Sequence, residues 1–246
     1  MDSVKNDYIK EFNKIFEEMT YKRGLNRRSA WENLMLMFAI DISNFTEIRE
    51  EVKKDRLDTF SSCTENLGGT DEPQKLFNII VKAISENPEQ DFLGDLYMSL
   101  GGIRELGQCF TPYHICSLMA ELSLEDSKTP IEENGFVSVA DPCVGAGAML
   151  IASANKIRND GYDPSTQALF YGQDLDQTCV CMAYIQLSLQ GLPAVVVQGN
   201  SLTEPYTGNP MFVEDNSNYW YTPILYTKAW EDKRKEYIKK YKKDVA

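Results

Sequence analysis

Apolar residues recur at helical spacing through the first ninety positions of the chain. Over residues 5–20 the large apolar side chains stand three or four positions apart, which predicts an amphipathic helix. The strongly apolar stretch 30–42 predicts a buried helix, with Ser29 as its N-cap and Glu32 completing a capping box. Further helices are expected at 45–60 and 76–84, separated by a turn-rich break at 66–73 and followed by a loop at 87–90. Because no strand-like alternation occurs in this part, we predict an all-helical N-terminal domain over residues 1–90.

A different pattern follows, in which short apolar runs end in turns and lead into helices. The run 136–140 ends in Asp141, and a turn containing Gly145 and Gly147 precedes a small-to-apolar helix start. The other elements expected here are strands at 168–171, 194–198 and 219–226, and a helix at 177–190. This alternation predicts an α/β domain with a doubly wound, mostly parallel sheet, which we place at residues 91–226.

The composition is that of a soluble globular protein. Of 246 residues, 43% are hydrophobic and 25% are charged. No run approaches the roughly 18 apolar residues that a membrane span requires, and the polar N-terminus does not resemble a signal peptide. The six cysteines form no C-x-x-C pair and there is one histidine. We therefore expect a cytoplasmic protein with reduced thiols, no metal site and no membrane partner.

The net charge of −12 argues against nucleic-acid binding by this chain alone, but the charge is unevenly distributed. Residues 227–246 carry eight Lys/Arg against four Asp/Glu, a local charge of +4, and form a predicted basic C-terminal helix. A solvated amphipathic helix is the favoured interpretation. Contact with a nucleic acid or a protein partner is the alternative.

Acidic and small residues follow each of the first three predicted strands. Asp141 ends the first strand, Asp174 lies 27 residues beyond Gly147 at the end of the second, and Asn200 follows the third. Because parallel strands bring their carboxyl ends to one edge, these side chains should meet there. An acid at that edge suits a ligand with amine or hydroxyl donors, although an ordinary βα connection is the alternative. Asp176 is read as the N-cap of the following helix.

A second candidate segment, Phe110-Thr111-Pro112, precedes the first strand. Thr111 is a plausible N-cap and Pro112 fits the first helical position. The segment would close over a ligand held by the glycine turn, whereas a capped helix start is the alternative. His114 falls in the first turn of this helix and is interpreted as a surface or packing residue.

Four motifs in this order resemble the adenine-N6 DNA methyltransferases, most closely the modification subunits of type I restriction systems. They are LGQCFTP (106–112), VADPCVGAGAML (139–150), YGQDLD (171–176) and QGNSL (198–202). The resemblance implies S-adenosylmethionine as cofactor. It assigns cofactor-binding roles to Phe110, Thr111, Pro112, Asp141, Pro142, Gly145, Gly147, Asp174 and Asn200. Cys109 stands where the family commonly has an aromatic residue.

The family's catalytic motif, Asn/Asp-Pro-Pro-aromatic, has only a degenerate match here. Asn209-Pro210-Met211-Phe212 has methionine at the second proline position and follows no apolar strand. By the resemblance, Asn209 and Pro210 would hold the amine of a flipped adenine and Phe212 would stack on that base. A simple loop turn is the favoured alternative.

Two functions from different classes follow. The first is an adenine-N6 DNA methyltransferase subunit that takes DNA recognition from a partner chain, because the residues after Tyr226 leave no room for the further strands and recognition region that the resemblance implies. The second is a catalytically inactive S-adenosylmethionine-binding regulatory protein, which would contact a protein partner or a second copy through an exposed aromatic cluster (Tyr219, Trp220, Tyr221) and the basic tail. Methylation of a protein glutamine is a weaker third option.

Overall fold

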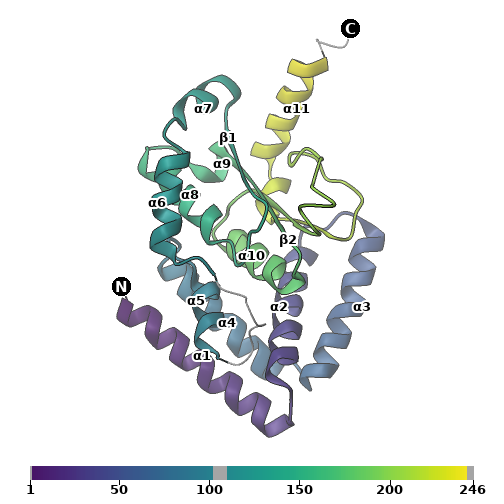
Figure 1. The fold of residues 1–246 in the computed structure, drawn as a ribbon. Helices are drawn as coiled ribbons and strands as arrows, with labels where there is room; N and C mark the ends of the chain where they lie inside the picture. The colour runs from purple at the N-terminus through teal and green to yellow at the C-terminus, as the bar shows by residue number, and fades with distance from the viewer. Residues whose placement is uncertain (1, 102–109, 243–246) are drawn as a thin grey trace.

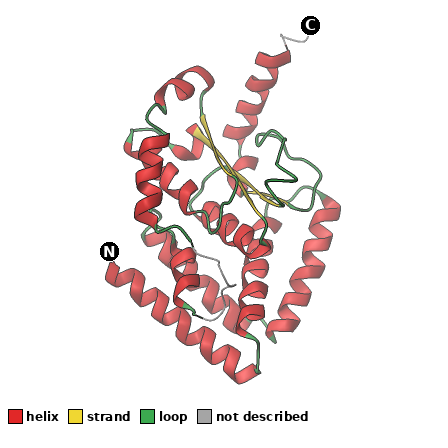
Figure 2. Ribbon diagram, in the orientation of Figure 1, coloured by secondary structure: helices red, strands yellow, loops and turns green. Residues whose placement is uncertain are grey.

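The computed structural model describes residues 2–101 and 110–242 and consists of a helical region beside a small sheet (Figures 1 and 2). The helices of the first hundred residues are α1 (Asp2–Arg23), α2 (Arg27–Asn44), α3 (Glu50–Leu67), α4 (Asp71–Glu86) and α5 (Phe92–Ser99). All-helical structure in this part was the prediction, and it is confirmed.

Local capping differs from the prediction at the start of α2. Asn26 is the N-cap, and its side-chain oxygen accepts a hydrogen bond from the Ser29 amide at 3.1 Å. Glu32 accepts from Arg28 on the same helix at 2.8 Å and therefore completes no capping box. The prediction of Ser29 as the N-cap is wrong. Asn26, three positions earlier, supplies the capping side-chain oxygen, and the helix therefore begins before Ser29.

The predicted break at 66–73 is shorter in the structure, and α3 begins five residues later than expected. Gly68 ends α3 in the left-handed conformation, with φ 74°, and its amide donates to the Glu65 carbonyl. Helix α4 resumes at Asp71 and contains Pro73, which fits there because the first turn of a helix has no carbonyl partner for an amide.

The second part of the chain is built around four strands. Its elements are α6 (Tyr113–Ser123), α7 (Lys128–Asn134), β1 (Val137–Asp141), α8 (Ala148–Asn159), α9 (Pro164–Gln167), β2 (Ala168–Asp174), α10 (Gln177–Leu189), β3 (Ala194–Gln198), β4 (Tyr219–Tyr221), a 3₁₀ turn η1 (Pro223–Tyr226) and α11 (Lys228–Lys242). The sheet order is β1-β2-β3-β4, with the first two pairings parallel. The predicted mostly parallel α/β fold behind an all-helical segment is confirmed.

The sheet separates two buried clusters. One face, with Phe170 and Val196, packs against α8 and α10 and joins a core that continues to Phe12 and Trp31 in the helical region. The opposite face, with Val195, packs against η1, α11 and the loop before β4. The boundary near residue 90 stays a prediction, since the first core runs across it without interruption.

The end of the sheet differs from the prediction. Only Tyr219–Tyr221 forms a strand, and it pairs antiparallel with β3, because Pro223 cannot donate to a ladder and begins η1 instead. Trp220 and Tyr221 are each 3% exposed. The prediction of an exposed aromatic contact surface is therefore wrong, since these rings fill the core on both faces of the sheet.

Helix α11 rises from the sheet toward the C-terminus (Figure 1). Trp230 is fully buried and donates its indole N–H to the Ser165 carbonyl at 2.9 Å. Lys233 donates to the Gly135 carbonyl at 2.9 Å. One side of the basic helix is thus anchored to the domain, as an amphipathic helix requires. None of the helices in the described ranges is long and apolar enough to cross a membrane.

Candidate cofactor site at the carboxyl edge of the sheet

The turn after β1 needs glycine at two positions. Gly145 has φ 53° and Gly147 has φ 98°, both in the left-handed region. A Cβ at Gly145 would lie 3.3 Å from the Phe110 ring, and one at Gly147 would lie 3.4 Å from Ala183 on α10. The predicted residues Phe110 and Gly145 are therefore brought into contact, and the turn is packed between the 110–112 segment and α10.

The same turn is bound to the end of β2. The Val144 amide donates to the Gln173 carbonyl at 2.9 Å. A Cβ at Gly172 would come within 2.7 Å of the Val144 side chain, so only glycine allows this approach. No role was predicted for Gly172, although a glycine inside an apolar strand is the usual signal of close packing.

Two predicted acids converge on this turn. Asp174 accepts from the Gly145 amide through Oδ2 at 2.9 Å and from the Asp176 amide through Oδ1 at 3.0 Å. Asp141 accepts from the Cys143 amide through Oδ1 at 3.0 Å, which leaves Oδ2 without a partner among the described residues. Burial raises the pKa of Asp141, the Cys143 hydrogen bond opposes that rise, and the nearby charge of Asp174 adds to it. The pair makes this edge acidic and suited to a ligand that donates hydrogen bonds.

The end of β3 completes the edge. The Gly199 amide donates to the Asp174 carbonyl at 2.9 Å, and the side-chain oxygen of Asn200 accepts from the Leu202 amide at 2.9 Å. Leu175 and Leu202, for which no role was predicted, are 70% and 91% exposed. Two exposed leucines directly after the polar residues of neighbouring strands give this edge apolar surface.

The helices α6 and α10, which flank this edge, begin with different kinds of cap. Helix α6 begins at Tyr113 with Pro112 in the cap position and no side-chain cap, so the prediction of Thr111 as N-cap is wrong. Asp176 caps α10 by accepting from the Thr178 amide at 2.8 Å, as predicted. Cys109 lies outside the described residues.

A buried polar network supports the turn from behind. Gln186 on α10 donates to the Ala146 carbonyl and to Asp91, both at 2.8 Å, and accepts from the Leu93 amide at 3.0 Å. Asp91 also accepts from the Gly94 amide at 2.9 Å, and burial raises its pKa. This connection between the start of α5 and the glycine turn was missed, because a single glutamine in an apolar helix carries no sequence signal.

The predicted catalytic residues form a turn on the α11 side of the sheet. The Met211 amide donates to the Asn209 side chain at 3.0 Å, and the Phe212 amide donates to the Asn209 carbonyl at 2.9 Å. Phe212 packs against Tyr237, with ring centroids 6.0 Å apart. Pro210 lies inside this turn, which is the loop structure that was favoured.

The segment that carries this turn nevertheless begins at the carboxyl edge. Gln173 at the end of β2 donates to the Glu204 carbonyl at 2.9 Å and accepts from the Tyr206 amide at 3.2 Å. Tyr206 stacks on Tyr171 with centroids 4.8 Å apart. The structure thus attaches residues 203–206 to the edge that holds the two acids, while Phe212 lies in the cluster on the opposite face from Val144 and Ala146.

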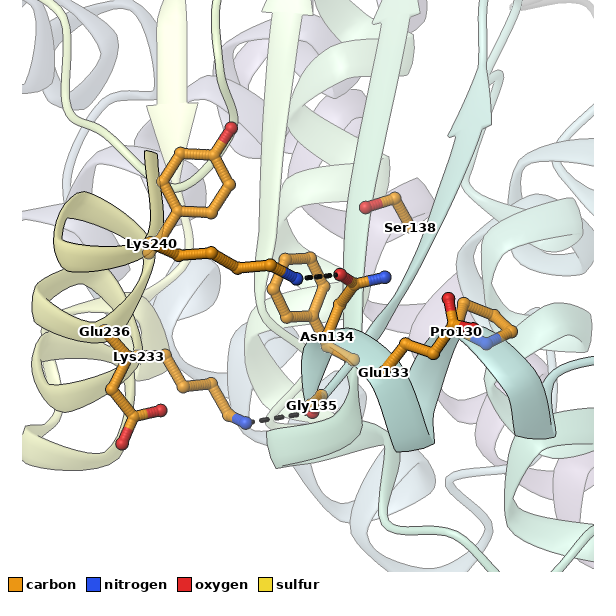
Figure 3. Close-up of a pocket in the computed structure, with 10 residues that line it drawn as sticks. Pro130, Glu133, Asn134, Gly135, Ser138, Lys233, Glu236 and Lys240 are labelled. Carbon is orange, nitrogen blue, oxygen red and sulfur yellow. Dashed lines mark hydrogen bonds between the residues drawn. The ribbon is translucent and has the colours of Figure 1, made fainter. Parts of the chain in front are cut away.

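A cavity of about 530 Å³ lies near the amino end of β1, between α7 and α11 (Figure 3). Lys233 and Lys240 reach across it to the Gly135 carbonyl and the Asn134 side chain, each at 2.9 Å. None of the predicted site residues lines it. The candidate site is therefore defined by the convergence of strand ends and not by this cavity.

Comparisons with known proteins agree with the motifs. The N-6 DNA methylase family matches residues 89–246. The type II restriction enzyme and methyltransferase RM.BcgI of Heyndrickxia coagulans is 32% identical over 148 residues, covering 54% of this chain and 22% of that protein. The chain thus spans about a fifth of the length of this curated relative.

Two solved structures are similar to this chain at 16% sequence identity. A candidate class I S-adenosylmethionine-dependent methyltransferase from Listeria monocytogenes has a TM-score of 0.45, with 92% of this chain and 70% of that chain covered. A type I restriction-modification methyltransferase subunit from Streptococcus thermophilus has a TM-score of 0.40, with 85% and 61% covered.

Three parallel strands that gather two acids around a glycine turn define an α/β protein of the Rossmann-like class. Because the family match extends over more than half of the sequence, the chain belongs to the N-6 DNA methylase family. The resemblance to adenine-N6 DNA methyltransferases is thereby confirmed.

Proposed function

We propose that this chain binds S-adenosylmethionine at the carboxyl edge of β1–β3 and serves methyl transfer to adenine N6 in DNA, with DNA recognition supplied by a partner subunit. The hydrogen bond from the Gly145 amide to Asp174 carries the proposal, because it joins the acid of the second strand and the turn of the first into one site. Membership of the N-6 DNA methylase family supports adenine in DNA as the acceptor.

The residues at this edge fit the cofactor. Gly145 and Gly147 leave room where a Cβ would meet Phe110 or Ala183. Oδ2 of Asp141 is available to accept from the ligand's amine or hydroxyl groups, and Asp174 faces the same turn. By the resemblance, Phe110, Thr111 and Pro112 would pack on the methionine end of the cofactor. Pro142 would belong to the loop around its methionine and ribose, and Asn200 would meet the adenine edge.

Apolar contact at the adenine end would come from two residues of the motifs to which the resemblance assigned no role. Leu175 and Leu202 are exposed at the ends of the turns that follow β2 and β3. Covering them with the flat face of a purine would remove apolar surface from water, which favours binding. Bound S-adenosylmethionine supplies a methyl group activated by its sulfonium.

On the acceptor side, Asn209 and Pro210 would orient the adenine amine and Phe212 would stack on the base. Direct transfer needs no covalent bond to the enzyme, so the contribution of these residues would be positioning and exclusion of water.

A second function, cofactor binding without catalysis, is favoured by one observation. Met211 is 2% exposed and Phe212 packs against Tyr237, so the degenerate motif is part of a packed cluster. In that case the chain would use S-adenosylmethionine to regulate its binding to a protein partner or to a second copy.

The experiment that tests the proposal combines two measurements on the unaltered chain. Calorimetric titration with S-adenosylmethionine is expected to show saturable binding, and a labelled-methyl assay on adenine-containing duplex DNA is expected to show transfer. Binding without transfer, also in the presence of a recognition subunit, would favour the second function. Absence of binding would overturn both.

Substituting Asn209 by alanine is expected to lower methyl transfer about five- to tenfold while cofactor affinity stays unchanged. The side chain would supply one hydrogen bond to the acceptor amine, which corresponds to about 1–1.5 kcal/mol. Asn218→Ala is the matched control, because Asn218 is an exposed asparagine of the same segment. Equal transfer rates in the two variants would remove Asn209 from the catalytic site.

Cofactor affinity is expected to fall on acidification at a higher pH than the usual range of an aspartate. Burial raises the pKa of Asp141, and only its ionised form accepts hydrogen bonds with both oxygens. Affinity is therefore highest above this raised pKa and is lost as the pH falls through it. Calorimetry at a series of pH values measures the midpoint, and Asp141→Asn should abolish the dependence.

A further inference from the structure

Glu47, Arg49 and Arg56 form a buried ion cluster between the helical region and the loop before β4. Their exposed fractions are 7%, 9% and 6%. Arg49 donates to both carboxylate oxygens of Glu47, at 2.7 and 2.6 Å, and Arg56 donates to one of them at 2.7 Å. Two guanidinium groups thus share one carboxylate, which leaves donors on each for other partners.

Those remaining donors reach the backbone of the loop. Arg49 donates to the carbonyls of Glu214 (3.1 Å), Asn216 (2.7 Å) and Tyr219 (3.0 Å). Arg56 donates to the Tyr219 carbonyl at 3.1 Å and to that of Ser217 at 3.4 Å. Glu214, Asn216 and Ser217 lie in an irregular segment outside the sheet, whereas Tyr219 is the first residue of β4. The arginine side chains add hydrogen bonds from the helical region to the carbonyls of this segment and of Tyr219.

The two guanidinium groups also pack on the rings of β4. Arg56 lies over Trp220 at 3.6 Å from the ring centroid, and Arg49 lies 5.3 Å from that of Tyr221. Planar stacking together with a forked set of donors is a property of arginine that lysine does not reproduce.

The clamped stretch is continuous with the turn that carries Asn209. The Glu214 amide donates to the Tyr221 hydroxyl at 3.0 Å, and the Tyr206 hydroxyl donates to the Glu214 carboxylate at 3.4 Å. Met211 packs in the same cluster as Tyr221. Residues 206–221 therefore form one unit, held at its end by the ion cluster and at its start by Gln173.

We propose that Glu47, Arg49 and Arg56 are positioning residues through which the helical N-terminal region fixes the 206–219 segment, whose start at Tyr206 is bonded to Gln173 at the cofactor edge. The proposal rests on the proposed function in assigning this segment to the methyl-acceptor side. It gives the helical region a role in presenting the acceptor side that is separate from cofactor binding.

The test uses Arg49→Lys and Arg56→Lys, which keep the positive charge and remove the planar guanidinium with its several hydrogen-bond donors. Hydrogen exchange of the full chain is expected to become at least tenfold faster over residues 206–219 in both variants, while α8 and α10 exchange as before. Arg158→Lys is the control, because Arg158 is a partly exposed arginine on α8 that bonds to Asn155 and lies 4.0 Å from Glu89, and neither of these partners is in the 206–219 segment. Unchanged exchange over 206–219, or equally faster exchange throughout the chain, would overturn the proposal.

Two functional readouts separate positioning from general stability. S-adenosylmethionine affinity is expected to stay within about twofold of the unaltered chain, whereas kcat for methyl transfer is expected to fall at least tenfold. Loss of cofactor affinity, or unchanged kcat beside locally faster exchange, would overturn the positioning role. If the unaltered chain transfers no methyl group even in the presence of a recognition subunit, methyl transfer as the proposed function fails, and the exchange pattern with the cofactor affinity still decides the role of the cluster.

Discussion

Replacing Asp141 by alanine is expected to weaken S-adenosylmethionine binding about 100-fold. The carboxylate ends β1 directly beside the glycine turn, and one of its oxygens is without a partner among the described residues. A charge-assisted hydrogen bond contributes about 1.5–3 kcal/mol, and 100-fold in affinity corresponds to about 2.7 kcal/mol. Calorimetric titration of the variant measures the loss.

Two control variants show whether the loss of cofactor affinity comes from the Asp141 side chain itself. Asp215→Ala removes the same charge from an exposed loop position and is expected to leave affinity unchanged. Asp141→Asn keeps an acceptor for the Cys143 amide and should retain the turn, so that it loses affinity without losing stability. If Asp141→Ala bound the cofactor as tightly as Asp215→Ala, the site at this edge would be wrong.

Replacing Gln186 by leucine is expected to destabilise the fold by about 3–5 kcal/mol. The substitution leaves three buried groups without one of their partners: the Ala146 carbonyl, the Leu93 amide and the Asp91 carboxyl. Each such loss costs about 1–3 kcal/mol. Thermal or denaturant unfolding gives the difference, and Gln177→Leu on the same helix is the control because Gln177 is exposed.

The loss of folding stability in Gln186→Leu is also expected to depend on pH. Burial raises the pKa of Asp91, and the Gln186 hydrogen bond opposes that rise. Without Gln186 the folded pKa rises further, so the folded state favours the protonated acid even more strongly. The stability that depends on protonated Asp91 is present at low pH, and it is lost as the pH rises through the pKa of Asp91 in the folded state. Gln186→Leu should therefore be more destabilising at pH 8 than at pH 5, and an equal loss at both would show that Asp91 does not couple to Gln186.

The first three strands could be predicted because each leaves a strong local signal. β3 is the apolar run at 194–198, and the turn after β1 contains two glycines that the backbone requires at positive φ. Asp174 was found in the same way, since an acid directly after a buried strand must lie at the carboxyl edge. The motifs added the family and the cofactor to this arrangement.

The errors had local and distant causes. Ser29 and Thr111 are good capping residues by type, but Asn26 caps α2 three residues earlier, and α6 begins after Pro112 with no side-chain cap. The three aromatic residues Tyr219–Tyr221 are typical both of a buried strand and of an exposed contact surface, so their composition does not distinguish the two. Their burial follows from pairing with β3 and from the arginines that pack on them.

The sequence by itself determined the helical first part, the parallel βα units and the acids and glycines of the candidate cofactor site, because periodicity and turn chemistry act within a few residues. Tertiary structure alone decided that Gln186 supports the glycine turn and that Arg49 and Arg56 hold the loop before β4. These contacts join residues between 40 and 170 positions apart, as in the bonds from Gln186 to Ala146 and from Arg49 to Tyr219. Their hydrogen bonds exist only once the helical region and the sheet have packed into one core, and so no local pattern records them.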